Sequence, residues 1–284
     1  MKRKIILFSL LILHGTQMKA QYGYAGISIG YGTGWPVYSL STSTKITSTS
    51  TTYTLEKGNF GQGLNFAFST GYMFNKNVGA ELGISYLIGS KKEFFVSGLA
   101  TDTNSGATTS TDGTITLDKI HMVRLNPALK LTMGDAVRPY LRMGINVGIK
   151  TGYTRIEEMV ITRTGSMNDT TTTSEVAREF KGGMAFGFSS AFGVDIDLTD
   201  NLIFFGELSF NSISWAATKS VVTRSLYNGV DMIPSSDPAS LETEYVDDYT
   251  VSQNHSNSNK ELKTYLPFGS FGISAGVIYR FGNE

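Results

Sequence analysis

Eleven residues near the end of the chain read Phe271-Gly272-Ile273-Ser274-Ala275-Gly276-Val277-Ile278-Tyr279-Arg280-Phe281. Apolar side chains stand at every odd position, whereas the even positions are mostly small or polar. Because successive side chains of a β-strand point to opposite faces, this stretch predicts a strand with one face that avoids water and one that does not.

The same alternation predicts seven further strands. In chain order, the eight predicted strands cover residues 22–34, 60–74, 78–89, 121–133, 140–152, 184–198, 202–215 and 265–281. Each is at least as long as the roughly 9–11 residues that a tilted strand needs to cross a bilayer.

The connections between these strands alternate between short and long. Three are short and have the Asn, Asp, Gly and Pro content of tight turns, namely 75–77, 134–139 and 199–201. The other four are long and polar. Antiparallel strands joined in this way place all short turns at one end and all long loops at the other, and an even number of strands lets the sheet close. The sequence therefore predicts an all-β fold, a closed eight-stranded antiparallel up-and-down transmembrane β-barrel with short periplasmic turns and long extracellular loops.

The start of the chain has the pattern of a secretory signal peptide. Lys2, Arg3 and Lys4 precede a largely apolar run, and a polar stretch then ends at Ala20. We expect a signal peptide at 1–20, a barrel domain at 21–284 and a location in the outer membrane of a Gram-negative cell. Loss of 1–20 removes four of the 24 basic side chains and none of the 24 acidic ones, so a slightly acidic chain without a nucleic-acid footprint remains. The absence of cysteine excludes disulfides and cysteine-based metal or redox sites.

The polar face of the predicted strands is small rather than charged. In the second strand it reads Gly63, Asn65, Ala67, Ser69, Gly71, and the opposite face carries Leu64, Phe66, Phe68, Tyr72 and Phe74. A surface in water would carry Lys and Glu, whereas small residues suit the crowded lumen of an eight-stranded barrel. The small face is therefore predicted to point inward and the apolar face toward lipid.

With these features the chain resembles the small eight-stranded outer-membrane barrels of the OmpA/OmpX type, and in particular the outer-membrane β-barrel domain proteins of Bacteroidetes. The resemblance covers residues 21–284 and rests on the topology, the exported N-terminus and the closing strand that ends Tyr279-Arg280-Phe281. It implies that the final strand is a signal for the barrel insertion machinery. We expect a monomer in outer-membrane lipid.

Two segments call for separate expectations. Pro127 cannot donate a hydrogen bond inside the fourth predicted strand, so we expect a local break in pairing without a change of register. The Ser- and Thr-rich tract at 39–54 has no apolar face, and we expect it to stay without regular structure. By contrast, β-branched residues at 158–162, 220–223 and 245–251 predict that strands six to eight, and a hairpin after strand five, project beyond the outer leaflet.

Charged residues gather on the inward parity. They are Glu81, Arg124, Lys130, Arg142, Lys150, Asp195, Asp197, Glu207 and Arg280. Opposite charges at similar height should pair, because an unpaired buried charge is costly. This pattern predicts an ion network that fills the lumen. The alternative is a narrow channel or small-molecule transporter.

No residue pattern marks a catalytic or cofactor site. After export two histidines remain, His255 in a polar loop and His121 at the start of a strand, so an outer-leaflet lipid-modifying enzyme stays an alternative with His121 as its base. The acidic fourth loop has no calcium-loop spacing, and no metal or cofactor is predicted. The leading hypothesis is a non-enzymatic structural or surface-interaction protein, whose long loops meet an extracellular ligand or protein, for example by β-augmentation.

Overall fold

The computed structural model describes residues 22–46, 50–101, 107–165, 169–250 and 259–281. The predicted signal peptide at 1–20 lies outside these residues, as does His255. The described chain is all-β apart from two short 3-10 helices, η1 (Ile233–Ser235) and η2 (Pro238–Leu241). In the described residues, no helix is long and apolar enough to cross a membrane.

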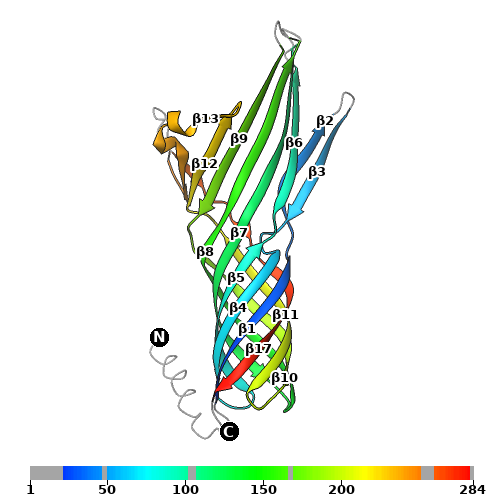
Figure 1. Cartoon of the computed structure of the whole chain (residues 1–284), viewed down its shortest axis with the longest axis vertical. Coiled ribbons are helices and arrows are strands. Elements are labelled where there is room, and N and C mark those ends of the chain that lie inside the picture. The colour runs from blue at the N-terminus through cyan, green and yellow to red at the C-terminus, as the bar shows by residue number, and fades with distance from the viewer. Residues whose placement is uncertain (1–21, 47–49, 102–106, 166–168, 251–258, 282–284) are drawn as a thin grey trace.

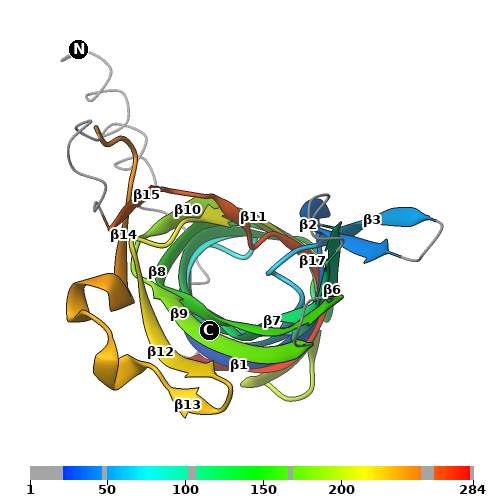
Figure 2. The same ribbon diagram turned by 90° about the horizontal axis from the view of Figure 1, so that it is seen from above.

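Eight strands pair with one another antiparallel in a ring, which Figures 1 and 2 show from the side and from above. They are β1 (Tyr22–Gly34), β4 (Gly63–Met73), β5 (Val78–Gly89), β7 (Thr108–Thr132), β8 (Val137–Thr164), β10 (Ala185–Asp197), β11 (Leu202–Trp215) and β17 (Ser270–Phe281). Each pairs with the next in this order, and β17 pairs back with β1, from Gly23↔Phe281 to Gly34↔Ser270. Every predicted strand has its counterpart in the ring.

The predicted ends of the strands differ most at the end of the ring that carries the long loops. β7 begins at Thr108 rather than at 121, and β8 continues to Thr164 rather than to 152. β17 begins at Ser270 after the two-residue strand β16 (Leu266–Pro267), whereas one strand was predicted from 265.

The outward face of the ring is apolar, as the alternation predicted. Its exposed large side chains include Ile27, Ile29, Leu64, Phe66, Phe68, Leu82, Ile84, Leu129, Leu141, Met143, Ile145, Phe186, Phe188, Phe192, Phe204, Leu208, Phe271, Ile273 and Val277. An exposed apolar surface of this extent indicates contact with lipid or with another protein.

The pairing of β7 with β8 is interrupted at Pro127. Leu125 pairs with Val147 and Ala128 with Gly144, but Asn126 and Pro127 have no partner on β8. The register is the same on both sides of the gap, so the expected local break without a register change is confirmed.

Lys150 corrects the inward assignment made from parity. Its side chain is exposed, and Thr151 beside it is buried. The cause is an irregularity of the ladder: Val123 pairs with Lys150, but Arg124 pairs with Gly148, so Ile149 is an extra residue on β8. A bulge of one residue moves the following side chains to the other face.

Above the ring, the sheet continues as an extension built from all four long connections (Figure 1). Its strands, besides the upper parts of β7 and β8, are β2 (Tyr38–Ile46), β3 (Thr51–Gly58), β6 (Lys92–Thr101), β9 (Thr170–Lys181), β12 (Lys219–Tyr227), β13 (Val230–Asp231), β14 (Glu242–Val246) and β15 (Lys260–Leu262). The hairpin of β8 with β9 agrees with the predicted hairpin after strand five. Strands six to eight do not themselves project, since β10 begins at Ala185, β11 ends at Trp215 and β17 begins at Ser270, and the separate strands β9, β12 and β14 project in their place. The pairing of β6 with β7 was not predicted.

The tract at 39–54 is also a correction. It was expected to lack regular structure, but most of its described residues lie in the hairpin of β2 and β3, from Tyr38↔Gly58 to Ile46↔Thr51. Thr is β-branched and favours strands, and a two-stranded hairpin can form without a buried apolar face when another strand supports it. That support comes from β6, since Thr44 pairs with Val96.

Candidate functional site

The interior of the ring is arranged in layers, and β11 shows their order. From the short-turn end upward, its inward residues are Ile203 and Phe205, then Glu207, then Ser209 and Asn211, then Ile213 and Trp215. The sequence of layers is apolar, charged, small and polar, and apolar again.

The lowest layer is a cluster of buried apolar side chains near the short turns. It consists of Tyr24, Met73, Tyr140, Ile203, Phe205 and Ile278, with Tyr22 packed against it. Residues from five ring strands therefore meet in this layer.

Arg142 is the centre of the charged layer above it. Its Nη1 lies 2.6 Å from Glu81 Oε1 and its Nη2 lies 2.7 Å from Glu207 Oε1. The second oxygen of each carboxylate accepts a hydrogen bond from a tyrosine: Tyr24 donates to Glu81 Oε2 at 2.9 Å and Tyr140 donates to Glu207 Oε2 at 2.7 Å. Charge-assisted hydrogen bonds of this kind are the strong ones in proteins, and they hold both carboxylates in place.

A second pair lies beside this centre. Lys130 Nζ donates to Asp195 Oδ2 at 2.8 Å, and both side chains are buried. The ammonium also lies 4.2 Å from the centre of the Tyr140 ring, within cation–π range. Tyr140 therefore contacts both the group around Arg142, through Glu207, and the pair of Lys130 with Asp195.

A third group lies below the charged layer, at the level of the lowest layer, since Asp197 pairs with Ile203. Arg138 donates to Asp197 Oδ2 at 2.6 Å, and Arg280 Nη2 donates to Asp197 Oδ1 at 2.8 Å. Arg138 was missing from the predicted network because it was assigned to a turn. Arg138 lies four residues before the inward Arg142, and residues an even number of positions apart in a strand lie on the same face, so the alternation could have placed Arg138 in the lumen.

Arg124 differs from the other buried cations. It is 3% exposed and donates to Ser85 Oγ at 3.2 Å and to Asn65 Oδ1, while its Nη1 has no hydrogen-bond partner in the described chain. No carboxylate of the described residues lies within salt-bridge distance of it. Together with Lys130 and Arg142 it balances three buried acids, Glu81, Asp195 and Glu207, so the middle of the lumen is neutral as a whole.

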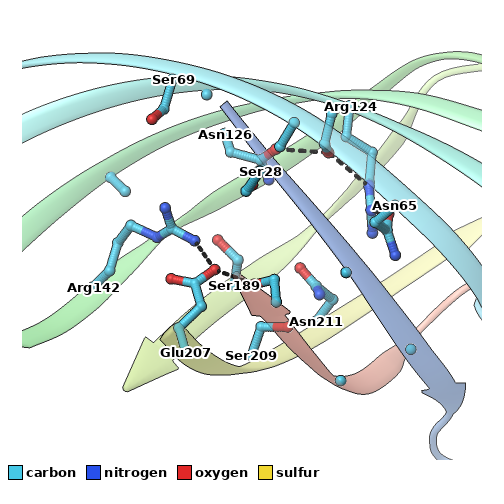
Figure 3. A pocket seen from close by; sticks show the side chains of 18 of the residues that line it. Ser28, Asn65, Ser69, Arg124, Asn126, Arg142, Ser189, Glu207, Ser209 and Asn211 are labelled. Carbon is cyan, nitrogen blue, oxygen red and sulfur yellow. Dashed lines mark hydrogen bonds and ion pairs between the residues drawn. The ribbon is translucent and has the colours of Figure 1, made fainter. Parts of the chain in front are cut away.

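A polar cavity of about 100 Å³ lies at the level of these residues (Figure 3). Arg124, Arg142 and Glu207 point into it, and its other walls are mainly small side chains such as Ser189 and Asn211. Such a volume holds a few water molecules, since one needs about 10–15 Å³ by this measure. The cavity can hydrate the network but is small for a solute path.

The top layer is the largest apolar cluster of the molecule. Its buried residues are Phe60, Leu87, Phe94, Leu117, Ile120, Met122, Tyr153, Phe180, Ala185, Ile213, Trp215, Ala217, Tyr245 and Phe268. Tyr153 stacks on Phe180 with ring centres 4.6 Å apart, and Trp215 meets Tyr153 edge-on at 6.2 Å. Strands of the ring and of the extension both contribute, so this aromatic layer joins the two regions.

The described residues considered for catalysis and metal binding have ordinary structural contacts. His121 Nδ1 lies 2.8 Å from the carbonyl oxygen of Lys119, and within the described residues no serine or carboxylate is bonded to the ring. Three acids of the fourth loop are engaged in exposed ion pairs, Glu242 with Lys219, Glu244 with Lys260 and Asp247 with Lys263. The described part of the chain holds no group of three His, Asp or Glu side chains suited to a metal ion.

Residues 5–219 match the family model described as outer membrane protein beta-barrel domain. The chain belongs to this family. It is accordingly a transmembrane β-barrel protein of the outer membrane of Gram-negative bacteria, and the apolar outward face of the ring is the surface that meets lipid.

Among solved structures, the chain is similar to neisserial surface protein A, NspA, with 10% identity over 92% of this chain and 97% of that one and a TM-score of 0.31. It is similar to Ail, the attachment invasion locus protein of Yersinia pestis, with 9% identity, 92% and 97% coverage and a TM-score of 0.27. The toluene transporter TbuX of Ralstonia pickettii matches with 9% identity, 95% and 91% coverage and a TM-score of 0.17. No curated protein matches the sequence.

Proposed function

We propose that the chain is a non-enzymatic surface-interaction protein, in which the ring is a closed eight-stranded membrane anchor and the extension acts outside the cell. One observation carries the proposal: β7 and β8 run without a break from the ring into the extension and are 25 and 28 residues long. A membrane crossing needs about 9–11 residues. More than half of each strand therefore serves the part beyond the bilayer.

The filled lumen supports an anchor rather than a channel. The lower apolar layer, the charged layer around Arg142 and the aromatic layer follow one another along the axis, with a cavity of only about 100 Å³ at the level of the charged layer. An eight-stranded barrel has an interior just wide enough for side chains. The charged groups act in this proposal as a structural network.

An edge of the extension offers a surface for a partner. Among the pairings of the described residues, β3 pairs only with β2, so its other edge has no strand beside it. Tyr53 and Leu55 of β3 are 72% and 52% exposed. An unpaired edge with exposed apolar side chains suits an extended polypeptide that adds to the sheet.

Conductance in planar bilayers tests the filled lumen. We expect no steady openings from the purified chain in its native sequence. Steady openings that disappear in Arg142→Gln or Glu207→Gln would contradict the proposal, because these residues would then line a conducting path.

Binding to an array of extended ten-residue peptides tests the outer part. We expect a subset of peptides to bind the native chain, and a variant with residues 39–57 replaced by a short Gly-Ser turn to lose that binding. A variant with residues 232–241 replaced in the same way is the matched control, since η1 and η2 also lie in the extension but away from β3. Peptide binding that persists without β2 and β3 would rule out this edge.

The lipid A composition of cells tests the absence of enzymatic activity. We expect the same composition in cells that carry the native chain, His121→Ala or no copy of the gene. A modification that requires His121 would show an enzyme instead. The proposal also includes export through a signal peptide at 1–20, insertion through the final strand, a monomeric state and no cofactor.

A further inference from the structure

A second cavity lies at the outer mouth of the ring, on the far side of the aromatic layer from the lumen. Its volume is about 310 Å³, at the lower end of the range for small-molecule sites. It is lined by Leu40, Phe60, Phe94, Ile115, Leu117, Tyr153, Arg155, Arg178, Phe180, Ala217, Tyr245, Glu261, Thr264 and Leu266. All four long connections contribute to this list, so the mouth cavity exists only when the whole extension is folded.

The floor and most of the wall are apolar or aromatic. Tyr153 and Phe180 are opposite each other on β8 and β9 and stack face to face, and Phe180 also meets Tyr245 at 5.9 Å. Phe60 packs edge-on against Tyr153 at 5.2 Å. These rings form the apolar part of the cavity lining.

Two arginines lie two residues farther along the same pair of strands, on the same face as Tyr153 and Phe180. Arg155 and Arg178 are direct cross-strand partners, an arrangement that like charges normally disfavour. Arg155 is neutralised by Glu157, whose Oε1 lies 2.7 Å from its Nε. No carboxylate of the described residues lies within salt-bridge distance of Arg178. Glu261 is the one acidic residue in the lining, and it has no ion pair with Arg178, so Arg178 is the cation of the lining that lacks a carboxylate partner among the described residues.

We propose that the mouth cavity binds a small, water-soluble amphipathic acid, with its apolar body on the Tyr153 and Phe180 rings and its anionic group at Arg178. Guanidinium groups bind carboxylate, sulfate and phosphate oxygens through paired hydrogen bonds, and Arg178 is free to do so. The apolar part gains by leaving water for an aromatic wall. The ligand enters from the water side, because Arg155 and Arg178 lie farther along β8 and β9 from the ring than Tyr153 and Phe180 do.

Trp215 provides the readout. It is fully buried in the aromatic layer and touches Tyr153 edge-on, and Trp35 is the only other tryptophan of the chain. In a Trp35→Phe background, with the full chain in lipid nanodiscs, 4-phenylbutyrate is titrated while Trp215 emission is recorded. The uncharged 4-phenylbutanamide is titrated in parallel, and empty nanodiscs correct for partition into lipid.

We expect a saturable change with the acid and at least about tenfold weaker binding of the amide, the difference that one hydrogen-bonded charge supplies. Arg178→Gln should lower the affinity for the acid by a similar factor and leave the affinity for the amide unchanged. Glu261→Gln should raise the affinity for the acid. Arg163→Gln is the matched control, since Arg163 is an exposed arginine of β8 outside the cavity lining.

The proposal is overturned if the acid gives no saturable change, if acid and amide bind equally, or if Arg178→Gln and Arg163→Gln behave alike. Folding of each variant is checked by its far-ultraviolet circular dichroism. Should Arg178→Gln not fold, the affinities of the acid and the amide for the native chain are measured at several salt concentrations instead. Only the affinity for the acid should fall as salt rises. Equal salt responses of acid and amide would then reject a role for the arginine.

Discussion

The ion pairs of the ring and those of the extension are made of the same groups but lie in different surroundings. In the ring, the side chains of Lys130 and Asp195 are 5% and 4% exposed, and those of Arg142 and Glu81 are 27% and 4% exposed. In the extension, the side chains of Lys219 and Glu242 are 44% and 53% exposed at a similar distance of 2.7 Å. Loss of one partner from a buried pair leaves an uncompensated charge, whereas water solvates the survivor of an exposed pair. The comparison teaches that the ion pairs of the ring should matter for stability much more than those of the extension.

Arg142→Met should have the largest effect on this comparison. It leaves Glu81 and Glu207 without their shared partner, and the expected loss is about 3–5 kcal/mol in the free energy of unfolding. Urea titration of the chain in lipid vesicles, followed by tryptophan emission, measures it. The triple variant Arg142→Met, Glu81→Gln, Glu207→Gln is the control and should recover most of the loss. A single variant as stable as the native chain would show that water, and not protein, surrounds these groups.

The outer faces of the two regions should differ as clearly as the interiors. Ile145 is 56% exposed on the lipid-facing side of the ring, and Val160 is 43% exposed on the same strand in the extension. Ile145→Arg should lower the free energy of unfolding by about 2–4 kcal/mol, because it places a charge in the hydrocarbon of the membrane. Val160→Arg should change the free energy of unfolding by less than about 0.5 kcal/mol. The two variants are compared by the same urea titration, and equal losses would mean that both positions face the same solvent.

Arg124→Gln should have an intermediate effect. The substitution removes the hydrogen bonds to Ser85 and Asn65, but no directly paired carboxylate is left behind. We expect a loss of about 1–3 kcal/mol, smaller than that of Arg142→Met in the same assay. Arg142 alone pairs with both Glu81 and Glu207, so one negative charge of this group is not balanced by it. Equal losses would mean that the electrostatic attraction of Arg124 to this charge, without contact, stabilises the chain as much as a direct ion pair does.

Most of the ring could be predicted from the sequence because it depends on a local rule. Alternation along Phe271–Phe281 and its counterparts places side chains in lipid or lumen residue by residue, and seven of the nine charges assigned inward join the pairs around Arg142, Lys130 and Asp197. Arg124 lies in the lumen without such a pair. Lys150 shows where the rule fails, because a single extra residue at the bulge changes parity and leaves no mark in the composition.

The extension could be predicted only in part because its structure depends on partners far apart in the sequence. The tract of Ser and Thr that forms β2 has no pattern of its own and is ordered by pairing with β3 and β6. The mouth cavity draws on Leu40, Phe94, Arg178 and Tyr245, which no spacing connects. Local alternation predicts the wall of the barrel but not the contacts that its loops make with one another.

The exposed pair of Lys219 and Glu242 should show the smallest effect. Lys219→Ala is expected to change the free energy of unfolding by less than about 1 kcal/mol, because both side chains lie near half exposure and an exposed pair gains little over its hydrated partners. The small change should shrink further at 1 M salt, where the Debye length falls to about 3 Å. Urea titrations of both chains at low and high salt measure this. A loss as large as that of Arg142→Met, and independent of salt, would show that the extension buries its charges on folding in the same way as the ring does.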